Sequence, residues 1–179
     1  IAAPMNEPEL RNMMYTALGS GHPFMIRYPR GHGEGLPWRG EKFETLPVGR
    51  GRRLREGADV ALLTVGTVGN AAARAAGRAA AEGVSVAHYD LRFVKPLDEA
   101  LLDEVGRKFR RVVTVEDGSL RGGVGEAVAA FFNGRGYDVR VQRLGIGDEW
   151  VEHGTPGQLY ALCGYDEEGI LRALLDTRA

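Results

Sequence analysis

In VALLTVGTVGNAAARAAGRAAAEGVSVAHY, residues 60–89, a continuous apolar run and a second predicted strand flank an alanine-rich segment. The apolar run ends at the glycine turn of residues 66–69, and the alanine-rich segment places apolar side chains at helical spacing until Gly83. Residues 84–89 form the second predicted strand. Continuous apolar strands that alternate with helices are typical of a mostly parallel sheet covered on both faces. The segment therefore predicts an α/β fold.

The same alternation continues toward the C-terminus. Pro96 and Asp98 are expected to open a helix, and Gly122 to Gly125 are expected to precede another. The remaining predicted elements are strands over 112–115 and 139–144 and short helices near 156–162 and 166–175. An extra strand near residues 50–54 is expected at an edge, which brings the sheet to five strands.

The N-terminal part has a different pattern. Residues 6–18 predict a helix, because Asn6 and Glu9 have the spacing of a capping pair ahead of an apolar stripe. Residues 23–28 predict a short buried strand that the following proline ends. Residues 31–47 are rich in glycine and have no period, so they predict a linker between two domains.

Composition excludes several classes of protein. The chain has 179 residues, 44% of them hydrophobic and 26% charged, which is typical of a globular protein. A formal charge of −1 gives no field that would collect nucleic acid or an anionic membrane. A single cysteine, with neither a membrane-spanning apolar run nor a signal peptide, predicts a reducing, cytoplasmic location. Because the chain starts at Ile1 and not at a methionine, it is expected to be part of a longer polypeptide.

The glycine turns at residues 66–69 and 122–125 both follow predicted strands, as in dinucleotide-binding proteins. Both depart from the G-x-G-x-x-G pattern, since the first lacks its core and Val128 replaces the third glycine of the second. The preferred interpretation is tight packing of backbone against a helix. The alternative is that one helix N-terminus holds an anion or ligand.

Arg27 and Arg30 lie close together in IRYPRG, residues 26–31, where the chain is expected to leave a strand. Ligands tend to bind outside the carboxyl ends of strands, and an arginine fork takes a phosphate or carboxylate through two hydrogen bonds. Arg30, which follows the proline, is free to project from the strand end and is the candidate anion-binding residue. The alternative is that Arg27 and Arg30 are ordinary surface charges.

The other titratable residues are expected to have structural roles. Glu116 and Asp117 are adjacent, so in a strand their carboxylates point apart and do not form a proton-sharing pair. Cys163 is expected to be a small core residue and not a nucleophile, since no base is near it in the sequence. No metal site or nucleophile–base pair is predicted, because the histidines are scattered: His22, His32, His88 and His153. His153 lies just before a predicted helix and suggests a structural or interfacial role.

Four stretches together resemble the 1-deoxy-D-xylulose-5-phosphate synthase family. They are IRYPRG at 26–31, YDLRFVKPLD at 89–98, TVEDG at 114–118 with GGVG at 122–125, and GDEWVEHGT at 147–155. Trp150 departs from the family pattern, where phenylalanine is common. The resemblance covers essentially the whole chain in the expected order. It implies that residues 1–30 end a pyrimidine-binding domain, 31–47 are a linker and 48–179 are a transketolase-like C-terminal domain.

The resemblance also implies a function. The family condenses pyruvate with glyceraldehyde 3-phosphate and releases carbon dioxide, giving a precursor of isoprenoids, thiamine and pyridoxal cofactors. Its cofactors are thiamine diphosphate and Mg²⁺, which parts of the protein upstream of Ile1 would hold. The expected partners are the rest of the polypeptide and a second copy in a homodimer, with no nucleic acid or membrane.

Residue by residue, the resemblance carries over Arg30 as the group that holds the phosphate of the acceptor. It implies no catalytic, cofactor-binding or metal-binding residue in this chain, which by itself is expected to be inactive. The C-terminal domain is expected to serve as a scaffold and dimer contact. The alternatives are the tail of a transketolase or of a 2-oxo-acid dehydrogenase β chain, and a free-standing dinucleotide-binding module.

Overall fold

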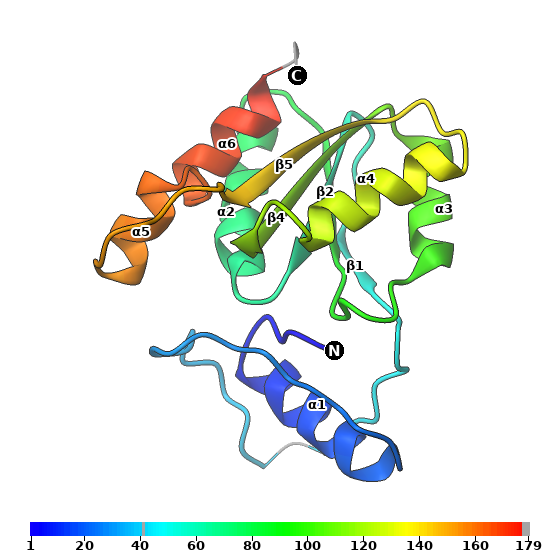
Figure 1. Cartoon of the computed structure of the whole chain (residues 1–179), viewed down its shortest axis with the longest axis vertical. Coiled ribbons are helices and arrows are strands. Elements are labelled where there is room, and N and C mark those ends of the chain that lie inside the picture. The colour runs from blue at the N-terminus through cyan, green and yellow to red at the C-terminus, as the bar shows by residue number, and fades with distance from the viewer. Residues whose placement is uncertain (41, 177–179) are drawn as a thin grey trace.

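The structure, a computed structural model, describes residues 1–40 and 42–176. A five-stranded sheet with the strand order β1-β3-β2-β4-β5 forms its main body (Figure 1). The strands are β1 (Arg52–Arg55), β2 (Val60–Val65), β3 (Val86–Asp90), β4 (Arg111–Ser119) and β5 (Arg140–Ile146). The four later strands pair in parallel, and β1 pairs antiparallel with β3 at one edge. The predicted fold class and the edge strand are confirmed.

Helices cover both faces of the sheet, as predicted (Figure 1). The helices are α1 (Glu7–Gly19), α2 (Val68–Ala81), α3 (Glu99–Lys108), α4 (Val124–Gly134), α5 (Pro156–Leu162) and α6 (Glu167–Leu175). One core layer lies under α3 and α4 and includes Phe109 and Phe132. The other lies under α2 and α6 and includes Tyr165 and Ile170. Burial of these apolar side chains is the main source of stability.

Helix α1 and residues 20–40 lie beyond one end of the sheet (Figure 1). The strand predicted over residues 23–28 is wrong. Among the described residues, Ile26 alone in this segment forms a ladder bridge, parallel to Ala2. Met25 and Tyr28 are 61% and 62% exposed, so the segment is extended but not buried. One bridging residue supplies too few backbone partners to make a strand.

The N-terminal segment rests on the carboxyl ends of the parallel strands. Ala3 is fully buried, and its amide donates a hydrogen bond to the Arg92 carbonyl at 2.9 Å. Gly66, which follows β2, has a φ of +80°, and a Cβ there would lie 3.5 Å from the Ala3 side chain. The region predicted as a linker has no regular structure over its described residues. The carboxyl edge of the sheet is therefore where both parts of the chain meet.

Candidate functional site at the carboxyl edge of the sheet

The chain leaves β2 toward β3 on one side and leaves β4 toward β5 on the other, so the topological switch point lies between β2 and β4. Ligands of open α/β sheets bind at this position. Here it is filled by Ala3, Arg27 and Pro29, which leave a cavity of about 50 Å³. Ligand pockets typically measure about 300–1,000 Å³. The switch point therefore has no room for a dinucleotide.

The glycine turn of residues 122–125 binds the carboxylate of Glu116, an anionic group of the protein itself. Glu116, 5% exposed, accepts hydrogen bonds from the Val124 amide at 2.9 Å and the Gly125 amide at 2.8 Å. A Cβ on Gly125 would lie 2.5 Å from the Thr114 hydroxyl. The Glu116 carboxylate thus caps α4 and satisfies its first amides. The predicted packing role of this turn is confirmed.

The first glycine turn packs on the N-terminal segment. The Asn70 side-chain amide donates to the Met5 carbonyl at 2.8 Å, and a Cβ on Gly69 would lie 3.2 Å from the Met5 side chain. A side chain at residue 69 would require Met5 to move by a few tenths of an ångström, so the turn packs tightly on the N-terminal segment. This turn too has the packing role that its sequence predicts.

Asp117 faces away from Glu116, as predicted for adjacent residues in a strand. Its carboxylate accepts hydrogen bonds from the hydroxyls of Tyr165 at 2.9 Å and Tyr160 at 3.3 Å. Burial, with the nearby Asp117 charge as a second cause, raises the pKa of both tyrosines. Arg27 donates to the Asp117 carbonyl and so links the N-terminal segment to β4. This contact gives Arg27 a structural role.

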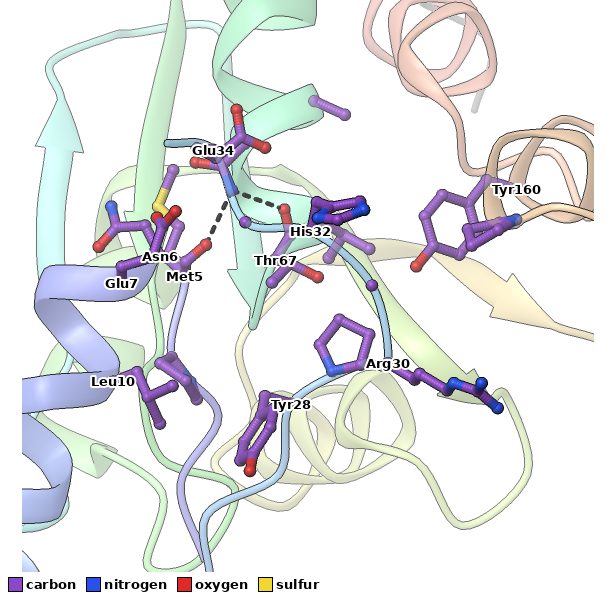
Figure 2. A pocket seen from close by; sticks show the side chains of 18 of the residues that line it. Met5, Asn6, Glu7, Leu10, Tyr28, Arg30, His32, Glu34, Thr67 and Tyr160 are labelled. Atoms are coloured by element: carbon purple, nitrogen blue, oxygen red, sulfur yellow. Dashed lines mark hydrogen bonds between the residues drawn. The ribbon is translucent and has the colours of Figure 1, made fainter. Parts of the chain in front are cut away.

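A larger cavity of about 450 Å³ lies beside the switch point (Figure 2). Its walls come from the start of α1, from residues 28–34, from the start of α2 and from α5 with the adjoining Tyr165. The cavity is therefore built from both parts of the chain. Figure 2 shows Glu7 and Leu10 on one side, and Arg30 extending away from them toward the side where Tyr160 lies.

The basic side chains that line this cavity differ in their partners. Arg74 is paired with Glu167 at 2.9 Å, so its charge is already matched. Arg30 is exposed and makes no hydrogen bond or ion pair with the described part of the chain. His32, two residues further on, is also exposed and unpaired among the described residues. An unmatched guanidinium on a cavity wall is suited to an anionic ligand.

A buried charge network, which the sequence analysis missed, joins α1 to the sheet domain. Arg92 binds both carboxylate oxygens of Glu9 at 2.8 Å, and Arg52 adds a contact at 2.9 Å. Arg52 also contacts Asp90 at 3.2 Å. Glu9 and Asp90 are 5% and 1% exposed. Arg92, which follows β3, has an unusual φ of +57°.

Comparisons with known proteins agree with this architecture. The family model described as "Transketolase, C-terminal domain" matches residues 49–170. The chain belongs to this family. A solved chain described as a split-gene transketolase, an inactive β4 tetramer, matches 97% of this chain and 55% of its own length. The TM-score is 0.83 and the identity 29%.

Curated relatives of this chain share one name. A protein from Bacteroides fragilis named 1-deoxy-D-xylulose-5-phosphate synthase is 53% identical over 99% of the chain and 28% of its own length. A protein of the same name from Symbiobacterium thermophilum is 44% identical over 95% of the chain and 26% of its own length. The resemblance seen in the sequence is confirmed. The chain spans about a quarter of the length of these relatives.

The resemblance implies thiamine diphosphate and Mg²⁺ as cofactors. The described residues of this chain offer no set of ligand groups for either of them. The described residues contain no group of three His, Cys, Asp or Glu side chains arranged to hold a metal ion. The first amides of α4 are already bound by Glu116, and the switch point is filled. The described residues therefore do not fit either group.

The remaining candidates lie apart from the cavity that Arg30 lines. His153 is exposed, and Thr155 caps α5 with a reciprocal bond to Gln158, as the sequence predicts. Cys163 is partly buried and packs against the core under α2 and α6. None of the described helices has the length and apolar character of a membrane span.

Two buried titratable groups on β3 have opposite shifts. His88 is 1% exposed, and its Nε2 lies 2.9 Å from the Thr64 hydroxyl. Burial, with smaller effects of Arg52 and Arg55, lowers the pKa of His88 to about 4. Burial also raises the pKa of Asp90 to about 6, against the effect of Arg52. His88 is therefore neutral in the folded state throughout the physiological range.

The contribution of His88 to the free energy of unfolding is expected to fall by about 2 kcal/mol between pH 7 and about pH 4.5. The reason is that the unfolded imidazole binds a proton over this range while the folded one does not. Asp90 acts in the opposite sense, since its folded carboxyl takes up a proton first, near pH 6. Denaturant unfolding should show the advantage of wild type over His88→Gln shrinking on acidification. An advantage that is the same at both pH values would contradict a neutral buried His88.

Proposed function

We propose that this chain is part of a 1-deoxy-D-xylulose-5-phosphate synthase, which condenses pyruvate with glyceraldehyde 3-phosphate and releases carbon dioxide. The observation that carries the proposal is the 53% identity, over 99% of the chain, to a protein of that name. Identity to the split-gene transketolase is lower, at 29%. This difference favours a synthase over a transketolase.

In this proposal Arg30 binds the phosphate of the acceptor. Its support is the unpaired guanidinium on the wall of a cavity of about 450 Å³. A guanidinium fork matches two phosphate oxygens and holds them through charge-assisted hydrogen bonds. Thiamine diphosphate, held with Mg²⁺ by other parts of the protein, would supply the electron sink for decarboxylation. The residues of this chain bind and orient the acceptor.

The proposal also divides the chain. Residues 1–30 would end a pyrimidine-binding domain, 31–47 would be a linker, and 48–179 would be the C-terminal domain. An apolar groove of about 700 Å³ beside α1 supports a larger N-terminal domain, because exposed Leu18 and Phe43 line it and suit a packing partner. We assign the C-terminal domain a scaffolding role with contacts in a homodimer. The single cysteine supports a cytoplasmic location.

The test is turnover by the full-length protein that contains this chain, supplied with thiamine diphosphate, Mg²⁺, pyruvate and glyceraldehyde 3-phosphate. We expect one carbon dioxide released for each acceptor consumed, and no product from residues 1–179 alone. A full-length protein that accepts ketose donors but not pyruvate would contradict the proposal and indicate a transketolase. Stoichiometric binding of nicotinamide or flavin nucleotides would instead favour a dinucleotide-binding module.

A further inference from the structure

The segment that carries Arg30 has little structure of its own. Residues 28–37 contain no helix or strand and are exposed throughout. Among the described residues, the one side chain that hydrogen-bonds this segment is Glu7, whose Oε1 accepts from the Gly35 amide at 2.7 Å. The Glu7 carboxylate is therefore the one hydrogen-bonding side chain that ties this segment to the rest of the described chain.

Gly33 makes a second contact with the same carboxylate. A Cβ on Gly33 would collide with Oε1 of Glu7, and it would lie 2.5 Å from the carboxyl carbon. The segment thus lies directly against the end of the Glu7 side chain, which a Cβ at residue 33 would push aside. Gly33 lies three residues from Arg30, so a shift here moves the guanidinium.

Glu7 is itself held firmly by α1. Asn6 caps this helix by accepting from the Glu9 amide at 3.2 Å, and Glu9 is bound by Arg92 and Arg52. The amide of Glu7 itself, followed by that of Gly35, holds the pKa of the Glu7 carboxyl below its ordinary value. The carboxylate is therefore ionised near neutral pH, and it belongs to a helix that is anchored to the sheet domain.

We infer that Glu7 is a positioning residue, which holds the segment of residues 31–35 so that Arg30 is presented to the cavity. The inference rests on the proposed function, because it gives Glu7 a role in binding the acceptor. An acidic residue in the first turn of a helix also interacts favourably with the helix dipole. That general effect requires neither the bond to Gly35 nor the close approach of Gly33.

The test uses the full-length enzyme with Glu7→Ala, Glu7→Gln and Gly33→Ala. Glu7→Ala should raise the KM for glyceraldehyde 3-phosphate roughly 2- to 10-fold, the usual worth of one hydrogen bond. The KM for pyruvate and kcat at saturating acceptor should be unchanged. Glu7→Gln keeps an acceptor oxygen and should recover most of the loss.

Gly33→Ala should raise the same KM, because the added Cβ would push the Glu7 carboxylate away from the Gly35 amide. Its effect should be smaller in a Glu7→Ala background, where the collision is removed, so the two substitutions should not be additive. Glu44→Ala is the matched control, because Glu44 is an exposed carboxylate of the same region with no side-chain contact among the described residues. Hydrogen exchange at the Gly35 amide should accelerate in Glu7→Ala and not in the control.

Two results separate this inference from the proposed function. If Arg30→Ala raises the acceptor KM but Glu7→Ala does not, the positioning role of Glu7 is wrong and the role of Arg30 stands. If Arg30→Ala leaves acceptor kinetics unchanged, the proposed role of Arg30 is wrong, and the inference about Glu7 falls with it. Equal rises of the KM values for pyruvate and acceptor in Glu7→Ala would indicate general damage and overturn the inference.

Discussion

Arg30→Ala is expected to lower kcat/KM for glyceraldehyde 3-phosphate by roughly 10- to 150-fold in the full-length enzyme, the equivalent of about 1.5–3 kcal/mol. In the proposed function Arg30 donates a charge-assisted hydrogen bond to the acceptor phosphate, and this variant would remove it. Arg30 has no partner among the described residues, so its removal leaves no buried charge unmatched in the protein. The effect should therefore appear in acceptor kinetics and not in the free energy of unfolding.

Two further variants sharpen this experiment. Arg30→Lys keeps the charge but loses the fork, so it should recover part of the activity. Arg107→Ala removes another exposed arginine, which lies in the last turn of α3 and does not line the cavity. It should behave as wild type. Acceptor kinetics that are the same in Arg30→Ala and wild type would show that the phosphate is held elsewhere.

Glu9→Ala is expected to reduce the free energy of unfolding by about 3 kcal/mol, because it leaves Arg92 and Arg52 without their shared partner. The Arg92 side chain is 13% exposed and that of Arg52 30%, so water compensates little for the first and partly for the second. Loss of this contact should also loosen α1. Denaturant unfolding and the rate of proteolysis within residues 31–47 would measure both effects.

Glu104→Ala is the control for this prediction. Glu104 pairs with Arg53 at 3.0 Å, but their side chains are 50% and 42% exposed. Such pairs contribute about 1 kcal/mol or less. A loss in Glu9→Ala no larger than that in Glu104→Ala would mean that the buried network does not hold α1 to the domain.

The sheet and its helices are largely predictable from the sequence, because continuous apolar runs such as residues 60–65 report burial on both faces directly. The same reasoning fails at residues 23–28. That run is apolar too, but a strand also needs backbone partners along its length, and apolar composition does not report them. Strand ends are also missed, since β4 continues beyond residue 115 to pair Ser119 with Ile146.

The site was predictable only in part. Glycine turns and a proline-flanked arginine are local patterns, so the sequence points to Glu116 and Arg30 as residues of interest. Glu9 matches a capping pattern with Asn6, but its carboxylate binds Arg92, which lies 83 residues away. No periodicity encodes a pairing at that separation. Arg92 also has a φ of +57°, and nothing in the sequence marks an arginine for that conformation.

The N-terminal segment that fills the switch point has a consequence for how this polypeptide can be divided. The model of the transketolase C-terminal domain begins at residue 49, but a cut there would uncover the end of β2 and remove Glu9 from Arg92. We therefore expect gene fission, domain exchange or truncation to preserve the fold only where residues 1–47 remain attached to the domain. The split-gene transketolase fits this rule, because one of its chains matches 97% of the present one and so retains both parts together.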